Sequence, residues 1–366
     1  MENLQLLVRP QKIPKHTNTN ILPDHLQLIT QFIQIVVPYV VPGQENPAVK
    51  YCQEIFPVLA TILDTFVDFP PICERVCRTW RYMVISYRTA MAPLLPQMAN
   101  KLANGFATSR QGCFLWVTSA ILREFSEDRE HVDEQTTEAI YAFFEAQSTA
   151  MLRMMNDLPP QELPDVIEDF YRLLIDALLY YPLKLAQSEL FTPIFQAAIA
   201  ALALEQRDPL SASLHYLRDV VGYGGDNPPS SGRSPNPPEI KQTIQSLILS
   251  NGEHLVKQIM AGMMITFPND CFTDGSGVLL GLFELMPEQT TVWVDKTVRM
   301  LPTGTIRDVE IDRLMTKIRE SLRTGREGVR QVRSLLQDFT NSYRRRYVAP
   351  RDGLGRLSAT RFQFSG

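Results

Sequence analysis

Apolar residues recur with a helical period along most of this 366-residue chain, and no segment alternates polar and apolar residues over a useful length. Between Asp24 and Arg346 the pattern divides into helical segments of about 12–22 residues, joined by short turns. The chain therefore predicts an all-α protein without a sheet.

These segments fall into pairs that span about 40–50 residues, which is the period of HEAT-type and armadillo-type repeats. A helical hairpin of this size cannot bury its own apolar face, so successive hairpins stack on one another. We expect an α-α superhelix of about seven stacked HEAT-type hairpins. A compact helical bundle is the alternative architecture, although single cores stop growing near this chain length.

The domain organisation follows from the ends of the periodic region. Residues 1–22 are predicted to be a polar extension, residues 23–346 the solenoid, and residues 347–366 a basic tail. Residues 222–238 are rich in Gly, Pro, Ser and Asn, and they predict a mobile loop inside the solenoid.

The charge of the chain is unevenly distributed. The net charge is −4, yet the residues from Asn341 onward include six arginines and one aspartate. A nearly neutral chain is not expected to bind nucleic acid directly. The longest apolar run, residues 29–41, is shorter than the roughly 20 residues of a membrane helix, so no membrane association is expected. The five cysteines are widely spaced and predict reduced thiols.

One predicted helix, residues 74–88 with the sequence ERVCRTWRYMVISYR, has two unlike faces. Four arginines fall within a sector of about 140° at the helical angle of 100° per residue: Arg75, Arg78, Arg81 and Arg88. Val76, Trp80, Met83, Val84 and Tyr87 lie on the opposite side. Guanidinium groups bind phosphate or carboxylate oxygens in pairs, so this row is a candidate docking site for an acidic or phosphorylated partner. The alternative is a solvated face in which Glu74 pairs with Arg78.

No catalytic constellation is found in the sequence, which predicts that the protein is not an enzyme and has no cofactor or metal. Cys73 and Cys77 are one helical turn apart, but no histidine or second pair accompanies them, so they are interpreted as buried structural residues. His215 is interpreted as a core or rim residue. The acidic run between Glu127 and Glu138 is interpreted mainly as a favourable helix start, and the alternative is attraction of an arginine-rich ligand.

Five stretches together resemble a known family: ERVCRTWRYMV, CFLWVTSAILREF, LHYLRDVV, VWVDKTVRMLP and VRQVRSLLQDFTNSYRRR. Their order and spacing are similar to those of the C-terminal part of transportin-SR (transportin-3) type nuclear import receptors, in the importin-β superfamily. The resemblance covers roughly residues 24–346, and the end of the chain looks like that of fungal members.

The resemblance implies a HEAT-repeat receptor that shuttles between nucleus and cytoplasm and imports Arg-Ser-rich or related RNA-binding proteins. It also implies Ran-GTP and nucleoporins as partners. In the family an arginine-rich helix contacts phosphoserines of the cargo, and Arg75, Arg78 and Arg81 match that helix. The family's fourth arginine falls on Ile85 here, and Arg88 is the candidate substitute.

The family's N-terminal repeats, which carry most of the Ran-GTP contact, have no counterpart in this chain, so we expect a fragment or a truncated product. The alternative function is a generic helical-repeat scaffold for protein interactions outside nuclear transport.

Overall fold

The computed structural model describes residues 21–40, 43–127, 131–225, 228–229, 236–302 and 304–348. Within these ranges the chain folds into α-helices with short 3-10 and π segments, and none of these residues belongs to a strand. The predicted all-α fold class of stacked helical hairpins is confirmed. The chain divides into two compact units, and the boundary falls within helix α10 (Phe191–Ala201).

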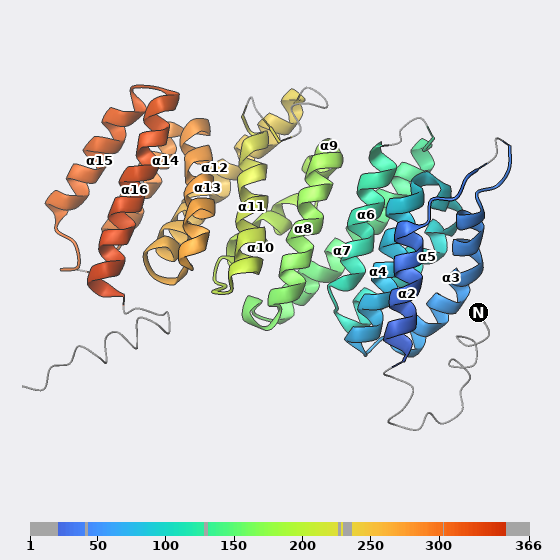
Figure 1. Ribbon diagram of the computed structural model, residues 1–366. Helices are drawn as coiled ribbons and strands as arrows, with labels where there is room; N and C mark the ends of the chain where they lie inside the picture. The colour runs from blue at the N-terminus through green and yellow to red at the C-terminus, as the bar shows by residue number, and fades with distance from the viewer. Residues whose placement is uncertain are drawn as a thin grey trace, which may run out of the picture. The chain divides into compact units, whose positions relative to one another are not determined.

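Unit 1 contains the helices that precede this boundary (Figure 1). They are α2 (Leu22–Ile35), α3 (Pro47–Thr65), α4 (Pro70–Tyr87), α5 (Leu95–Ser109), α6 (Cys113–Glu127), α7 (Glu134–Asp157), α8 (Pro164–Tyr180) and α9 (Pro182–Gln187). Two 3-10 segments, η1 (Arg88–Leu94) and η2 (Pro160–Glu162), connect α4 to α5 and α7 to α8.

The helices of unit 1 form two layers. In one layer α2 packs on α4, α4 on α6, and α6 on α8. In the other layer α3 packs on α5, and α5 on α7. Contacts of α3 with α4 and of α5 with α6 join the layers. Since consecutive helices lie in different layers, each hairpin buries its apolar face against the next hairpin, as in helical-repeat proteins.

Unit 2 repeats this two-layer scheme. Its helices are α11 (Arg207–Tyr223), α12 (Pro238–Ala261), α13 (Phe272–Leu285), α14 (Pro287–Arg299), α15 (Asp308–Leu322) and α16 (Arg326–Tyr347), with a π segment η3 (Gly262–Thr266) and a 3-10 segment η4 (Asn269–Cys271). α11 packs on α13 and α13 on α16, while α12 packs on α14 and α14 on α15.

Proline sets several of the helix boundaries. Helices α3, α4, α8, α12 and α14 have proline in their first positions, where the missing N–H has no intrahelical partner to lose. Pro57 lies inside α3. The helical period of residues 24–40 predicts one helix with a kink at Pro38. This prediction is wrong, because α2 ends at Ile35 and Val36 is extended. The residue before a proline avoids the α-region, which favours ending the helix upstream.

Asp133 caps the N-terminus of α7, in agreement with the interpretation of the acidic run as a helix start. Its carboxylate accepts a hydrogen bond from the backbone N–H of Thr136 at 2.6 Å. Hydrogen bonding to Thr136, first to its side chain and then to its backbone N–H, lowers the pKa of Asp133. The cap satisfies one of the backbone donors that have no partner at a helix start.

The predicted loop and tail are only partly within the described residues. Helix α11 continues to Tyr223 and α12 begins at Pro238, so both ends of the predicted loop 222–238 are helical or close to a helix. Residues 226–227 and 230–235 lie outside the described residues, as do the extension before residue 21 and the tail after residue 348.

Candidate functional site

Helix α4 is fixed in place by its apolar face. Ile72, Val76, Trp80 and Val84 are completely buried, as the sequence predicted for the last three. The Trp80 ring stacks on Phe56 of α3, with the ring centroids 4.9 Å apart. These contacts orient the helix so that its arginine-bearing side is left uncovered.

A buried hydrogen bond adds to this orientation. The hydroxyls of Thr79 on α4 and Thr30 on α2 are 2.7 Å apart, and both residues are buried. Each hydroxyl also bonds to a carbonyl one turn earlier in its own helix. Because a buried hydroxyl without a partner is costly, this pair favours one rotation of α4 against α2.

Arg75, Arg78 and Arg81 form a row on the uncovered side of α4, which we call the arginine row. Arg78 is exposed, and the other two are half-buried. Within the described part of the chain, no carboxylate forms an ion pair with any of the three, and Glu74 does not pair with Arg78. The Arg81 guanidinium lies over the ring of Tyr82, 5.8 Å from its centroid. The row therefore keeps its guanidinium donors available to a ligand.

Arg88 is placed differently from the other predicted docking residues. Helix α4 ends at Tyr87, and Arg88 begins the 3-10 segment η1 with a φ of 46°. Its Nε is 3.2 Å from Oε2 of Glu124 on α6, a carboxylate that also receives Nε of Arg123 at 3.0 Å. The side chain of Arg88 is still 58% exposed. Arg88 thus does not continue the arginine row along α4, and part of its donor capacity is already used.

A cavity of about 340 Å³ opens beside the arginine row, between α4, α6 and α8. We call it the α4–α8 groove. Its lining comes from three helices of unit 1: Arg78, Arg81 and Tyr82 from α4, Leu115, Trp116 and Ser119 from α6, and Asp169, Arg172 and Leu173 from α8. The side chains of Trp116 and Tyr82 are only half-buried, so aromatic surface faces the opening. The groove combines guanidinium groups, aromatic rings and a carboxylate.

The α8 side of the groove carries carboxylates whose pKa values are raised. Burial is the main cause that raises the pKa of Asp169 to about 6, partly offset by a hydrogen bond from Trp116. Burial also raises the pKa of Asp176, which accepts a hydrogen bond from the Ser119 hydroxyl. Arg172 pairs with Glu168 one turn earlier at 2.5 Å. At neutral pH Asp169 is therefore expected to be ionised at a partly desolvated surface.

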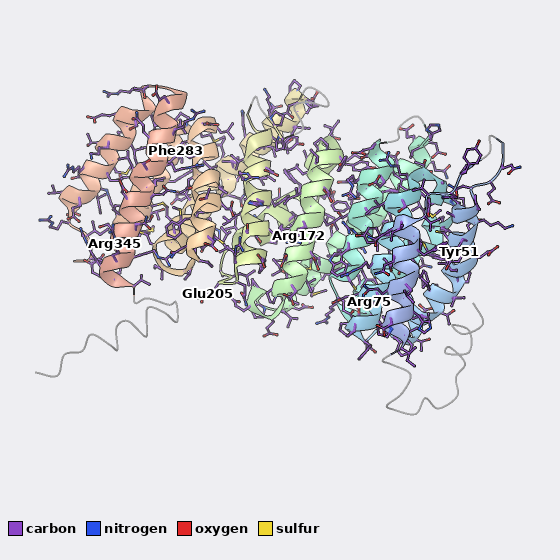
Figure 2. The ribbon with its side chains drawn as sticks, viewed as in Figure 1. Tyr51, Arg75, Arg172, Glu205, Phe283 and Arg345 are labelled. Carbon is purple, nitrogen blue, oxygen red and sulfur yellow. The ribbon has the colours of Figure 1, made fainter. Side chains whose placement is uncertain are left out.

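The residues that line the groove come from helices that are distant in sequence. Figure 2 labels Arg75 on α4 and Arg172 on α8, which stand on either side of α6 in unit 1. The sequence analysis identified the arginine row but not Trp116, Asp169 or Arg172. Trp116 lies in the stretch CFLWVTSAILREF, whose nearly all-apolar sequence predicts burial on most sides, and the approach of α8 depends on the stacking of repeats.

The cysteines fit the prediction of reduced, buried thiols. All five are free and buried. Burial raises the pKa of Cys52 and Cys73 to about 12 and that of Cys271 to about 11, and it also raises the pKa of Cys77. Within the described ranges, no three His, Cys, Asp or Glu side chains are grouped as a metal site would require.

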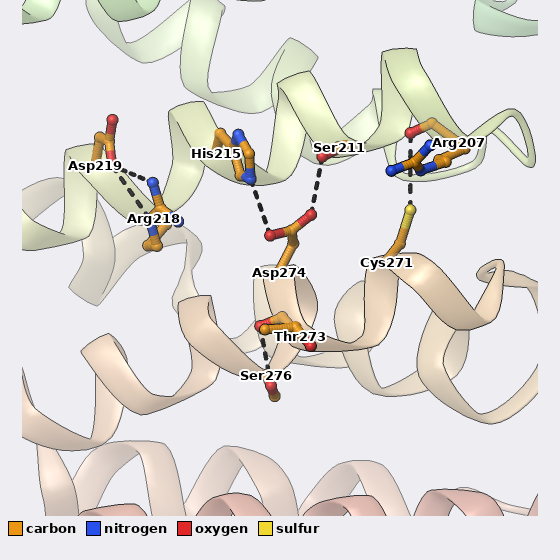
Figure 3. Close-up of polar contacts among 9 residues, drawn as sticks. All are labelled: Arg207, Ser211, His215, Arg218, Asp219, Cys271, Thr273, Asp274 and Ser276. Carbon is orange, nitrogen blue, oxygen red and sulfur yellow. Dashed lines mark hydrogen bonds and ion pairs between the residues drawn. The ribbon is translucent and has the colours of Figure 1, made fainter.

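A second polar cluster lies between α11 and α13 in unit 2 (Figure 3). His215 Nε2 is 2.9 Å from Asp274 Oδ1, and the Ser211 hydroxyl donates to Asp274 Oδ2 at 2.8 Å. Both groups bind the same carboxylate, whereas a serine nucleophile needs its hydroxyl bonded to the imidazole. His215 is therefore a satisfied residue at the rim of the helix contact, as interpreted from the sequence.

Two arginines near the C-terminus hold α16 in unit 2. Arg344 Nη1 donates to the carbonyls of Phe267 at 2.8 Å and Met263 at 3.3 Å, and its guanidinium lies over the Phe272 ring. Arg346 pairs with Glu310 of α15 at 3.3 Å. Both arginines thus serve packing within unit 2, just before the predicted basic tail 347–366. No helix among the described residues is long and apolar enough to cross a membrane.

Comparison with known proteins identifies homologues over most of the chain. Residues 46–152, which include α4 and α6, match the family model described as the fourth TPR domain of transportin-3 and importin-13. An uncharacterized protein of Schizosaccharomyces pombe is 33% identical over 94% of this chain and 36% of its own length. The mRNA transport regulator MTR10 of Saccharomyces cerevisiae is 26% identical over 90% of this chain and 36% of its own length.

Importin-13 is similar in both sequence and fold. The human protein is 22% identical over 82% of this chain and 29% of its own length. A solved structure titled "Importin13 cytosolic state" superposes with a TM-score of 0.75 at 15% identity, over 94% of this chain and 37% of that one. The chain spans about a third of the length of the curated relatives it matches. It is thus homologous, over most of its length, to importin-13 and MTR10 of the karyopherin group.

Proposed function

We propose that this chain is the cargo-binding, C-terminal portion of a karyopherin of the transportin-SR type. Its cargo is an Arg-Ser-rich or related RNA-binding protein, which it carries into the nucleus while shuttling through the nuclear pore. Homology to importin-13 and MTR10 supports the transport role, and the family model that matches α4 names both transportin-3 and importin-13. Such a receptor works by binding and release and does not need an active site.

The observation that carries this proposal is the arginine row beside the α4–α8 groove. Arg75, Arg78 and Arg81 form no ion pair with a carboxylate among the described residues, although Arg81 is close enough to Asp176 to lower its pKa. An arginine fork binds two phosphate oxygens at once, and charge-assisted hydrogen bonds are the strong ones. A phosphorylated side chain of the cargo is the ligand that matches this chemistry.

Arg88 has a peripheral place in the proposed site. Its exposed guanidinium adds positive charge near the end of α4, while its Nε holds Glu124. We expect it to contribute through long-range attraction more than through a direct contact. Ran-GTP and nucleoporins are further partners that the proposal implies, and no residue of this chain is assigned to them.

Charge reversal tests the proposal. The variant Arg75→Glu, Arg78→Glu, Arg81→Glu should lose binding to a phosphorylated Arg-Ser peptide by at least about a hundredfold, since each charge-assisted contact contributes about 1.5–3 kcal/mol. The matched control is Lys50→Glu, Arg153→Glu, Lys257→Glu, three exposed cations on α3, α7 and α12. It changes the net charge equally and should retain binding. Equal losses in both variants would mean that the arginine row does not dock the cargo.

A further inference from the structure

A second cavity lies within unit 2, where the ends of its helical hairpins meet. Its volume is about 680 Å³, and its lining comes from the end of α11, the start of α12, the turn between α13 and α14, and the turn between α15 and α16. We call it the hairpin-end cavity. The lining residues that the structure describes all belong to unit 2. A cavity of this volume is typical of ligand pockets.

The wall of the hairpin-end cavity is mainly apolar and lacks side chains in places. Leu285 and Leu322 are half-buried, so part of their apolar surface faces the opening. Gly222, Gly225 and Gly281 are also half-buried and leave backbone uncovered. A flat ring can approach such backbone closely, because glycine has no Cβ. The combination favours an aromatic side chain as the ligand.

The polar groups of the cavity do not favour an anion. The N–H groups of Gly224 and Gly225 donate to carbonyls three residues earlier at 3.0 and 3.1 Å, so this glycine turn offers no free backbone donors for a phosphate. Lys241 already takes part in an interaction of its own. Glu284 is exposed at the rim and forms no ion pair within the described part of the chain. The cavity is therefore matched to an aromatic side chain with a basic neighbour.

The chain itself contains such a segment after α16. Residues 349–366, which we call the tail, belong to unit 2 and lie outside the described residues. Arg361 directly precedes Phe362 in the tail, and Phe364 follows two residues later. By contrast, residues 226–227 and 230–235 are close to the cavity in sequence but contain no aromatic side chain.

The tail is long enough to reach the cavity. Helix α16 begins next to the cavity, which Val329 lines, and ends at the opposite edge of unit 2 (Figure 1). Its 22 residues extend over about 33 Å at 1.5 Å per residue. Residues 349–361 span up to about 45 Å when extended. A tail that returns along α16 can therefore bring Phe362 to the cavity.

We propose that the hairpin-end cavity binds the tail of this chain, with Phe362 and Phe364 inserted between its glycine and leucine surfaces. Residues two apart in an extended chain point to the same side, so both rings enter together. Arg361 contacts Glu284 at the rim. The tail thus covers the cavity and competes with any other segment that presents an aromatic side chain beside a basic one. This interaction is independent of the cargo site in unit 1.

Photo-crosslinking in the full chain tests where the tail binds. The photoreactive residue p-benzoylphenylalanine replaces Phe362, and mass spectrometry identifies the cross-linked residues after irradiation. The inference predicts cross-links to cavity residues such as Leu285 and Leu322, and cross-links only outside the cavity would overturn it. In a mixture of unlabelled and isotope-labelled chains, the cross-links should join residues of the same chain. Cross-links between chains would mean that a second copy supplies the segment, which also overturns the inference.

Peptide competition measures whether the tail occupies the cavity. A fluorescein-labelled peptide of residues 356–366 should bind the full-length variant Phe362→Ala, Phe364→Ala at least about tenfold more tightly than wild type by fluorescence anisotropy, because only the wild-type tail competes with it. The control Leu354→Ala, Leu357→Ala keeps both rings of the tail and should behave as wild type. Equal affinity of the peptide for wild type and the Phe variant would overturn the inference.

Two changes of the cavity, each made in the Phe362→Ala, Phe364→Ala background, should weaken binding of the labelled peptide by at least about tenfold. A Cβ at Gly225 has its nearest neighbour at 3.6 Å, so Gly225→Leu adds a side chain without a backbone clash. Glu284→Lys reverses the charge of an exposed rim residue. The control Asp157→Lys reverses an exposed carboxylate of α7 in unit 1 and should leave the affinity unchanged. Unchanged affinity in both cavity variants would contradict the assigned site.

Discussion

Nε of Arg88 lies 3.2 Å from Oε2 of Glu124, and the glutamate side chain is only 6% exposed. A nearly buried carboxylate needs compensating donors, which Arg88 and Arg123 supply from different elements. This contact joins η1 to α6 and gives Arg88 a structural role in unit 1.

Arg88→Ala should lower the free energy of unfolding by about 1 kcal/mol, because water screens the exposed arginine and Arg123 still holds the carboxylate. Urea denaturation of the full chain measures this change. In a Glu124→Gln background the same substitution should cost much less, and an equal loss in both backgrounds would contradict the assignment. Arg88→Ala should also weaken binding of a phosphorylated Arg-Ser peptide less than Arg78→Ala does.

The contact of Arg344 with the π segment η3 predicts an asymmetry between two adjacent arginines. Arg344→Ala should destabilise unit 2 by about 1–3 kcal/mol, because two carbonyls lose a charged donor. Arg345→Ala should be nearly neutral, since Arg345 is exposed and bonds only weakly to the Asn341 carbonyl at 3.3 Å. Thermal unfolding of the two variants compares them directly, and equal shifts would remove Arg344 from the packing of α16.

Two helical glycines should respond oppositely to alanine. A Cβ at Gly252 of α12 would lie 2.4 Å from the Trp293 ring, so Gly252→Ala should cost about 1–3 kcal/mol through overpacking. A Cβ at Gly277 of α13 would have its nearest neighbour at 3.6 Å, so Gly277→Ala should stabilise by about 0.5–1 kcal/mol through helix propensity. The measurement is denaturant unfolding, and a stabilising Gly252→Ala would contradict the close α12–α14 contact.

The raised pKa of Asp169 predicts a pH dependence with a defined sign. Its pKa is about 6 in the folded chain and about 4 in an unfolded one. Between these values the folded state binds more protons, so this residue's contribution to stability is greatest below pH 4 and is lost as the pH rises through 6. The Asp169→Asn variant should not show this loss of stability as the pH rises.

Comparing wild type with Asp169→Asn isolates the contribution of Asp169 to the pH dependence of stability. Other carboxylates, such as Asp176, contribute equally to both proteins. The Asn variant should gain stability relative to wild type between pH 4.5 and pH 7, by at most about 3 kcal/mol, since one pKa unit corresponds to about 1.36 kcal/mol. Urea unfolding at the two pH values gives the difference. A constant difference across this range would show that Asp169 is not desolvated.

Local features of unit 1 could be predicted from sequence because they depend on neighbouring residues. The apolar positions Val76, Trp80 and Val84 predicted the buried face of α4, and Asp133 predicted the start of α7. The end of α2 was misplaced because proline affects the residue before it as well as its own position.

The composition of the groove could not be predicted in this way. Trp116 and Asp169 are far from the arginine row in sequence, and they reach it through the packing of α6 on α4 and of α8 on α6. Arg88 was placed on the α4 face because helical spacing alone carries no signal for the backbone change at φ 46°. Its pairing with Glu124 required the position of α6.

The most direct test of the central claim is the coupling between cargo phosphorylation and the arginine row. Affinities of the phosphorylated and unphosphorylated forms of one Arg-Ser peptide are measured for wild type and for Arg78→Gln, Arg81→Gln by isothermal titration calorimetry. Phosphorylation should strengthen binding to wild type by at least about tenfold, and the double variant should lose most of that gain. An equal gain from phosphorylation in wild type and variant would contradict the account.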